Sequence, residues 1–351
     1  MSLPDFQLDR FGRRLSFVAA TLFCLASSCA KQEELEPVML YGKALGTKWS
    51  VVFVPAAGQD FPGELELEET VLKTIGRVDA LMSTFREDSD IGRFNGRPGY
   101  LEPFELDPET RKVVAAAIHY ARETGGAFDP TVGPLVGLWG FGAGASRDEP
   151  VVGQVEEVLE RVGFGLLEWN ESGHLKRRLP GVELDLSAIA KGYVADAVLE
   201  ALGRYRPAGL MVEIGGDLRV AGTRASGEPW RLGIQNPDGG LYSVVLSTGG
   251  ALATSGDYRR YRNRGDERIS HIIDPRSGHS AATGIVSVSV LAPTALEADA
   301  IATALMVLGE KDGLAYVEER AWLEALFKVR DSETQSINTL RSSGWAASTK
   351  E

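Results

Sequence analysis

Four short runs with alternating apolar residues follow one another between residues 210 and 247, and turns that contain Gly, Asn or Asp separate them. The runs are LMVEI (210–214), LRVAG (218–222), WRLGI (230–234) and YSVVLS (242–247). Alternation with a period of two is typical of half-buried strands, and turns of this kind favour antiparallel pairing. The sequence therefore predicts an antiparallel meander in this region.

Helical periodicity occurs on both sides of these strands. Helices are expected at 67–85, at 154–162, at 295–308, and from Pro108, where Asp107 supplies an N-cap and Gly125-Gly126 a stop. Further strands are expected at 49–54, 182–186, 268–275 and 284–293, a helix–strand unit at 310–330, and a loop at 86–99. We therefore predict an α+β fold in which antiparallel β-sheets are flanked by helices in a single unit.

The first 29 residues have the pattern of an export signal. Three arginines precede a 14-residue apolar run, Leu15 to Ser28, which is too short to cross a bilayer comfortably. The sequence LASSC ending at Cys29 resembles a bacterial lipobox, although Ala26 stands where Leu is usual. We expect a protein exported to the periplasmic side of a bacterial membrane and lipid-anchored at Cys29. The alternative is a signal without lipid attachment.

Charge and cysteine content exclude several functional classes. The formal net charge of −12 argues against a nucleic-acid-binding protein. Both cysteines, Cys24 and Cys29, lie in the signal region, so the rest of the chain has no disulfide, thiolate metal site or catalytic cysteine. We expect a linker at 30–37, one undivided domain at 38–330 and a loose polar tail at 331–351.

The stretch DLSAIAKGYVAD (185–196) is interpreted as a strand end that turns into a helix, with Ser187 as the N-cap. The free N–H groups of such a helix form an anion site, and Lys191 in the first turns is easiest to explain if it faces a bound anion. Asp185 at the strand end could accept hydrogen bonds or face a metal. The alternative is a capped amphipathic helix with a surface lysine.

Two residues of the 295–308 helix offer oxygen ligands for a metal. Asp299 and Thr303 are separated by four positions and therefore share one helix face. A carboxylate and a hydroxyl suit Mg²⁺ better than zinc, and a backbone carbonyl near Ala188 could add a third ligand. The same pair is also common on a plain helix surface.

Three other segments contain candidate site residues. His271 in SHIIDPRSG could act as a base beside a phosphate site, or it could be an ordinary half-buried strand histidine whose side chain lies opposite that of Ile272. Ser255, Gly256 and Asp257 are expected in a tight turn that either binds an anion or simply closes a hairpin. The apolar Gly- and Pro-rich segment 127–142 is typical of a pocket wall.

Together these segments resemble the ApbE family, the FAD:protein FMN transferases. The resemblance covers about residues 38 to 330 and depends on the order and spacing of several motifs: ALGTKWSV, MSTF, GGAFDPTVGPLVGLWGFG, ELDLSAIAKGYVAD, EIGGDLRVAG, ATSGDYRRY, SHIIDPRSG and VLAPTALEADAIATAL. It implies an ApbE-like (T-fold-like) architecture. Glu213, where the family often has Asn, and Leu45, where Met is common, depart from the pattern.

The resemblance also implies roles for individual residues. His271 corresponds to the proposed catalytic base. Magnesium ligands are implied at Ala188, Asp299 and Thr303, and contacts with FAD are implied at Leu45, Phe85, Ala127, Phe128, Asp129, Asp185, Lys191 and Ile272.

The implied reaction is Mg²⁺-dependent transfer of FMN from FAD to a threonine hydroxyl of a target protein, with release of AMP. The implied targets are flavin-carrying subunits of membrane electron-transfer complexes, of the sodium-pumping quinone reductase or Rnf type. Two alternatives remain open: an FAD pyrophosphatase that produces FMN and AMP, and an FAD-binding lipoprotein without turnover.

Overall fold

The computed structural model describes residues 36–58, 60–142, 150–237, 239–258, 261–264, 267–345 and 349–350. The predicted signal, the lipobox at Cys29 and most of the linker lie outside these residues. From residue 36 onward the described chain belongs to one compact unit. Within it, no helix has both the length and the apolar character needed to cross a membrane.

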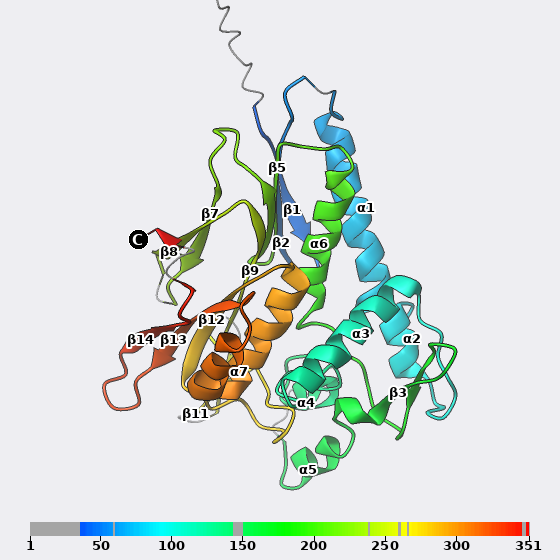
Figure 1. The fold of residues 1–351 in the computed structure, drawn as a ribbon. Helices are drawn as coiled ribbons and strands as arrows, with labels where there is room; N and C mark the ends of the chain where they lie inside the picture. Colours follow the sequence, from blue (N-terminus) through cyan, green and yellow to red (C-terminus); the bar gives the residue numbers. More distant parts are fainter. Residues whose placement is uncertain are drawn as a thin grey trace, which may run out of the picture. The chain divides into compact units, whose positions relative to one another are not determined.

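An eight-stranded sheet forms the centre of this unit (Figure 1). All neighbouring strands in it are antiparallel. Its strands, in spatial order, are β1 (Val38–Ala44), β2 (Thr47–Val54), β5 (Gly209–Ile214), β6 (Asp217–Gly222), β9 (Gly249–Gly256), β12 (Ile285–Ala292), β13 (Glu324–Arg330) and β14 (Ile337–Arg341). The predicted antiparallel α+β class is therefore confirmed.

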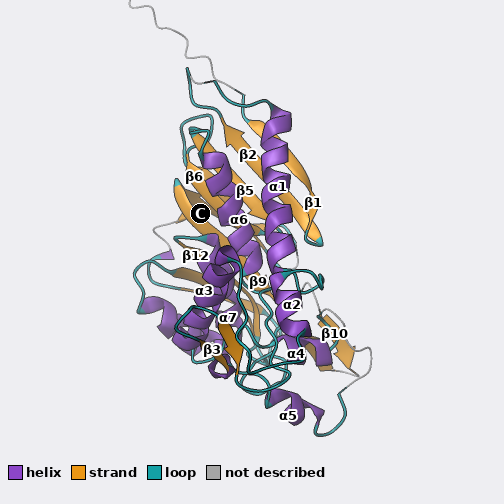
Figure 2. Ribbon diagram, turned by 90° about the vertical axis from the view of Figure 1, so that its right-hand side faces the viewer, coloured by secondary structure: helices purple, strands orange, loops and turns teal. Residues whose placement is uncertain are grey.

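Three helices cover one face of this sheet: α1 (Glu64–Met82), α6 (Ala190–Gly203) and α7 (Ala295–Glu318), as Figure 2 shows. A smaller sheet of β7 (Trp230–Gln235), β8 (Leu241–Ser247) and β15 (Thr349–Lys350) contributes to a second core on the opposite face. Alternate residues of the inner strands of the main sheet therefore enter different cores. In β2, Val51 and Phe53 belong to the helix-side core, whereas Val54 belongs to the second one.

Shorter elements surround this centre. They are α2 (Asp90–Gly96), α3 (Pro108–Glu123), α4 (Gly133–Leu138), α5 (Gln154–Leu159), the 3₁₀ turn η1 (Phe164–Leu166), the hairpin of β3 (Leu167–Trp169) with β4 (Leu175–Arg177), and the hairpin of β10 (Tyr261–Arg264) with β11 (Glu267–Ser270). The predicted start of α3 is confirmed, because the Asp107 side chain accepts a hydrogen bond from the Glu109 N–H group.

The prediction of a strand at 182–186 was wrong, although the burial of this segment does alternate. The Asn95 side chain bonds both backbone groups of Leu184, at 2.9 Å to the carbonyl and 2.8 Å to the N–H group. An asparagine amide thus replaces a partner strand. Ser187 is not the N-cap of the following helix, because α6 begins at Ala190 after a turn.

Two predicted loops contain helices. The segment 86–99 includes α2, which is capped by Ser89 through a 2.8 Å bond to the Gly92 N–H group. The segment 127–142 includes α4. Both helices have fewer than eight residues, too few for the periodic pattern to stand out in the sequence.

The predicted meander is split between two sheets. β5 and β6 form a hairpin in the main sheet, but β6 then pairs with β9, while β7 and β8 pair with each other in the smaller sheet. Ser255 lies in strand β9 and not in a tight turn.

The prediction of a loose tail at 331–351 was also wrong. β14 pairs with β13 over five residue pairs from Leu326–Arg341 to Arg330–Ile337. Trp345 is only 1% exposed and packs in the second core. The segment is polar overall, yet it contains an edge strand and one large buried side chain.

Candidate active site

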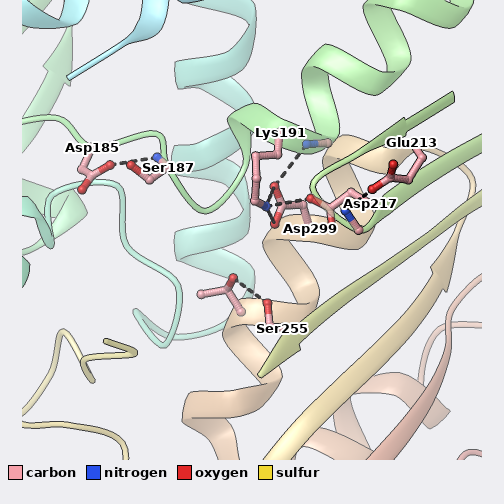
Figure 3. A network of polar contacts seen from close by, with 10 residues as sticks. Asp185, Ser187, Lys191, Glu213, Asp217, Ser255 and Asp299 are labelled. Atoms are coloured by element: carbon pink, nitrogen blue, oxygen red, sulfur yellow. Dashed lines mark hydrogen bonds and ion pairs between the residues drawn. The ribbon is translucent and has the colours of Figure 1, made fainter. Parts of the chain in front are cut away.

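A buried ion-pair cluster lies where α6, α7 and β6 meet (Figure 3). The Lys191 Nζ atom is 2.7 Å from Oδ2 of Asp217 and 2.9 and 3.0 Å from the two carboxylate oxygens of Asp299. The two aspartate side chains are at most 4% exposed, whereas the lysine side chain remains 37% exposed. The cluster therefore has one open side, through the lysine.

Each member of the cluster is positioned by the start of an element. Lys191 is the second residue of α6, and Asp217 is the first residue of β6. Gly215 and Gly216 join β5 to β6 with φ angles of 61° and 102°, which is the left-handed conformation that a tight hairpin of this length needs. Asp299 lies in the second turn of α7.

The cluster carries an excess of negative charge above the pKa of Asp217. Burial and the neighbouring Asp299 carboxylate raise the pKa of Asp217 to about 7. Burial favours the neutral amine of Lys191, but the two carboxylates outweigh this effect and raise the pKa of the lysine. With Asp217 ionised, one ammonium faces two carboxylates, so an additional cation would be favoured here.

The helices α6 and α7 approach each other very closely beside this cluster. The Gly192 N–H group donates to Oδ2 of Asp299 at 3.1 Å, and a Cβ atom at Gly192 would lie 2.0 Å from the Ala295 carbonyl oxygen. Asp196 accepts hydrogen bonds from the first N–H groups of α7, those of Ala295 and Leu296, at 3.0 and 2.9 Å. A carboxylate of α6 thus caps the helix that carries Asp299.

The anion at the start of α6 is therefore supplied by the protein itself. We expected the free N–H groups of this helix and Lys191 to face a bound phosphate. In the structure one of these groups, the Gly192 N–H, and Lys191 both interact with Asp299, and Lys191 also interacts with Asp217.

The expected metal ligands lie in this region. Thr303 is one turn beyond Asp299 on α7, and its Oγ1 atom is 3.2 Å from Oγ of Ser255 on β9. Ala188 lies in the turn that precedes α6. No cluster of three His, Cys, Asp or Glu side chains occurs in the described residues, so a metal here would need hydroxyl or backbone oxygens. The carboxylate and hydroxyl donors fit a hard cation such as Mg²⁺, and Oδ1 of Asp299 has Lys191 as its one described partner.

The other expected contacts with the cofactor lie in neighbouring loops. Asp185 is separate from the ion-pair cluster (Figure 3), and its side chain bonds the Ser187 N–H group and lies against Gly133 at the start of α4. Ala127, Phe128 and Asp129 are at most 5% exposed.

Asp129 holds its own loop together. Its carboxylate accepts bonds from the Thr131 N–H and hydroxyl groups and from the Phe164 N–H group at 2.6 to 2.8 Å. Burial raises the pKa of this carboxyl, although these hydrogen bonds oppose the shift. Its described role is to shape the loop.

His271 follows the end of β11 and is not inside a strand, so the expected alternation of His271 and Ile272 on a strand does not occur. The His271 ring is edge-on to Phe141, with centroids 6.2 Å apart, and the Arg262 guanidinium lies 5.7 Å from the same Phe141 ring. Ile272 is 7% exposed. The aromatic segment after α4 therefore packs beside the candidate base.

Two expected contact residues expose apolar side chains. Phe85 is 77% exposed, and Leu45 is 37% exposed with a φ angle of 52°, unusual for a residue other than glycine. Both side chains are accessible to a ligand.

A cleft of about 1090 Å³ lies beside the β1–β2 turn. The residues around it come from that turn, from the β5–β6 turn and from β7: Lys43, Lys48, Glu213, Gly216, Gly233 and Gln235 are examples. Sequence reasoning missed this cleft and also missed Asp217 as a partner of Lys191. The signal for Asp217 was present, because an acidic residue directly follows Gly-Gly between two strand-like runs.

Known proteins are similar to this chain over most of its length. The model of the ApbE family matches residues 45–327. An FAD:protein FMN transferase of Vibrio cholerae serotype O1 is 39% identical over 306 residues, which cover 86% of this chain and 90% of the relative. A protein with the same name from Haemophilus influenzae is 37% identical, covering 84% of this chain and 87% of the relative.

Solved structures with the same fold are flavin transferases as well. The flavin transferase ApbE from Vibrio cholerae superposes with a TM-score of 0.80 at 35% identity, covering 89% of this chain and 99% of that protein. The apo form of the Pseudomonas stutzeri flavinyl transferase ApbE also has a TM-score of 0.80, at 33% identity, with coverage of 89% and 96%.

Proposed function

The chain belongs to the ApbE family, and from this we propose that it is an FAD:protein FMN transferase. It transfers FMN from FAD to a hydroxyl group of a target flavoprotein and releases AMP. The observation that carries this proposal is the match to relatives of that name over almost their full length. The acceptor hydroxyl is a threonine, and the target proteins are flavin-carrying subunits of membrane electron-transfer complexes.

Asp299, Thr303 and the Ala188 carbonyl would hold Mg²⁺, which would neutralise charge on the phosphoryl oxygens when bound. This part of the proposal is supported by the hard oxygen donors and by the excess negative charge around Lys191. Lys191 orients the Asp299 carboxylate through two hydrogen bonds. Because its side chain is partly exposed, it also adds positive potential on the open side of the cluster.

His271 would accept the proton of the attacking threonine hydroxyl at a ring nitrogen. The ring of His271 is half-buried and packs edge-on against Phe141, and this partly accessible position supports the role. The His271→Ala variant should lose turnover while FAD still binds. Loss of FAD binding instead would make His271 a cofactor contact.

The site of action is proposed from the first 29 residues. An export signal ending at Cys29, with lipid on this cysteine, would hold the enzyme at the periplasmic side of a bacterial membrane, close to membrane-bound acceptors.

A mass spectrum tests the function directly. The mature chain is mixed with FAD, Mg²⁺ and the flavin-carrying subunit of a sodium-pumping quinone reductase, with a control that lacks the subunit. An FMN phosphoester on the subunit together with AMP supports the transferase. AMP and free FMN without labelling would identify a pyrophosphatase, and bound FAD without AMP would identify a binding protein.

A further inference from the structure

The cleft beside the β1–β2 turn opens on the face of the main sheet opposite to the ion-pair cluster. Neighbouring residues of a strand point to opposite faces. Asp217 faces the helices and Lys191, whereas the next residue, Leu218, lines the cleft. On β9, Ser255 contacts Thr303 of α7, whereas Thr254 lines the cleft. The cleft and the ion-pair cluster thus lie on opposite faces of the main sheet, at the same end of its strands.

The turn of Gly215 and Gly216 connects these two sides. Both glycines line the cleft, and Asp217 follows them directly. The Gly215 N–H group donates to the Lys48 carbonyl at 2.9 Å, which joins this turn to the β1–β2 hairpin. A ligand in the cleft is therefore separated from the ion-pair cluster by one hairpin turn.

Two lysines give the cleft its charge. Lys43 on β1 and Lys48 on β2 are paired directly opposite each other, and both line the cleft. Both are exposed, and neither makes an ion pair with another described residue. Like charges directly opposite in an antiparallel pair are unfavourable. Their juxtaposition is explained if an anionic ligand lies between them.

Glu213 does not neutralise this pair. Its carboxylate accepts hydrogen bonds from the Ser50 hydroxyl at 3.2 Å and from the Gly216 N–H group at 2.7 Å. Glu213 also lines the cleft, but these two bonds hold its carboxylate beside the glycine turn, and against two lysines it leaves the cleft with one net positive charge.

The size and the lining of the cleft suit an extended chain. Its volume of about 1090 Å³ lies at the upper limit of pockets for small molecules, about 300 to 1,000 Å³. Gly233, Ile234 and Gln235 of β7 form one wall, and β7 is the edge strand of its sheet. An edge strand presents backbone groups to which an extended peptide can add.

We propose that this cleft binds an extended, acidic segment of the acceptor protein next to the hydroxyl that receives FMN. This inference depends on the proposed function, because it identifies how that enzyme holds its protein substrate. Lys43 and Lys48 contact acidic side chains of the segment, and the β7 edge pairs with its backbone. The acceptor hydroxyl then reaches the reaction centre around the Gly215–Gly216 turn.

Charge reversal tests the proposal. The variant Lys43→Glu/Lys48→Glu is compared with Lys73→Glu/Lys311→Glu, which changes the net charge equally at two exposed helix positions away from the cleft. The probe is the unflavinylated subunit of a sodium-pumping quinone reductase, and a second probe has lysines introduced beside its acceptor threonine. Binding of each probe, FAD affinity and FMN transfer are measured separately.

The proposal predicts that the cleft variant binds the natural subunit at least tenfold more weakly, keeps wild-type FAD affinity and regains affinity for the lysine-bearing probe. The control variant should behave like the wild type. Equal losses of FAD and subunit affinity would make the cleft a nucleotide subsite, and unchanged subunit binding would show that the acceptor docks elsewhere. Either result overturns the proposal. Absence of FMN transfer by the wild type would instead contradict the proposed function, because probe binding is read independently.

Discussion

Lys191 bridges two carboxylates that are distant in the sequence, since its Nζ atom is 2.7 Å from Asp217 and 2.9 Å from Asp299. One side chain thus joins the start of α6 to β6 and to α7. The ammonium group is what allows two buried carboxylates to lie side by side.

Replacing Lys191 by Met should therefore destabilise the fold. Breaking a buried ion pair typically costs about 3–5 kcal/mol, and we expect a loss near 3 kcal/mol because this lysine is partly exposed. Urea unfolding at pH 8 measures the change. The double variant Lys191→Met/Asp217→Asn should lose less unfolding free energy, because it also removes one of the two buried carboxylate charges that Lys191 would otherwise neutralise. Equal stability of Lys191→Met and wild type would contradict this account.

Gly192→Ala should push α6 and α7 apart, because the added Cβ atom would lie 2.0 Å from a backbone carbonyl oxygen. We expect a loss of about 1–3 kcal/mol in unfolding free energy, typical of overpacking, together with lower turnover. Gly203→Ala is the matched control in the same helix, since nothing lies within 4 Å of its added Cβ. The control should keep full activity and be no less stable than the wild type.

Thr303→Val and Ser255→Ala separate a metal ligand from its neighbour. Each change removes the same 3.2 Å contact between hydroxyl groups, but only the first removes the expected ligand oxygen. The Mg²⁺ concentration for half-maximal turnover should rise at least about tenfold more in Thr303→Val than in Ser255→Ala. Turnover measured against Mg²⁺ concentration gives this value for each variant. The same Mg²⁺ dependence in both variants would show that Thr303 is not a metal ligand.

Asp129 should make stability depend on pH. Burial raises its pKa in the folded state above the usual value of about 3.9, so the folded state binds more protons than the unfolded chain above that pH. The contribution of this group is thus largest below pH 4 and decreases as the pH rises toward its folded-state pKa. Asp129→Asn cannot ionise. The stability of wild type relative to Asp129→Asn should therefore fall as the pH rises above about 4. Denaturant titrations of both proteins at several pH values measure it, and a relative stability that rises with pH would show that the pKa is lowered.

Trp345→Ala tests the structured C-terminal segment. This side chain is 1% exposed, and removing a buried Trp typically costs about 3–5 kcal/mol. Trp322→Ala is the control, because that ring is 56% exposed, and it should cost less than about 1 kcal/mol. Thermal unfolding of both variants distinguishes them, and equal melting temperatures would restore the interpretation of a loose tail.

Local signals in the sequence predicted local structure well. The Asp107–Pro108 start of α3 and most strands of the main sheet follow from patterns within ten residues. The segment 182–186 shows the limit of such patterns. Its alternation reports burial correctly, but a side chain from a distant helix, Asn95, takes the place of a strand. Periodicity cannot identify the bonding partner.

Only part of the site could be predicted, because sequence patterns identify local neighbours and not distant partners. Asp299 and Thr303 lie on one helix, so their common face follows from spacing alone. The partners of Lys191 are 26 and 108 residues away, and the packing of α6 against β6 and α7 brings them together. Sequence reasoning therefore found the lysine but assigned it a bound phosphate where the protein supplies its own carboxylates.

The alternation at the end of the main sheet has an evolutionary consequence. Asp217 and Leu218 are consecutive, as are Ser255 and Thr254, yet the two side chains of each pair lie on opposite faces of the main sheet. Adjacent codons can therefore mutate under different selective pressures. A lineage could retune which partner protein it recognises at Thr254 or Leu218 and leave the chemical step untouched, so divergence in substrate choice need not pass through inactive intermediates.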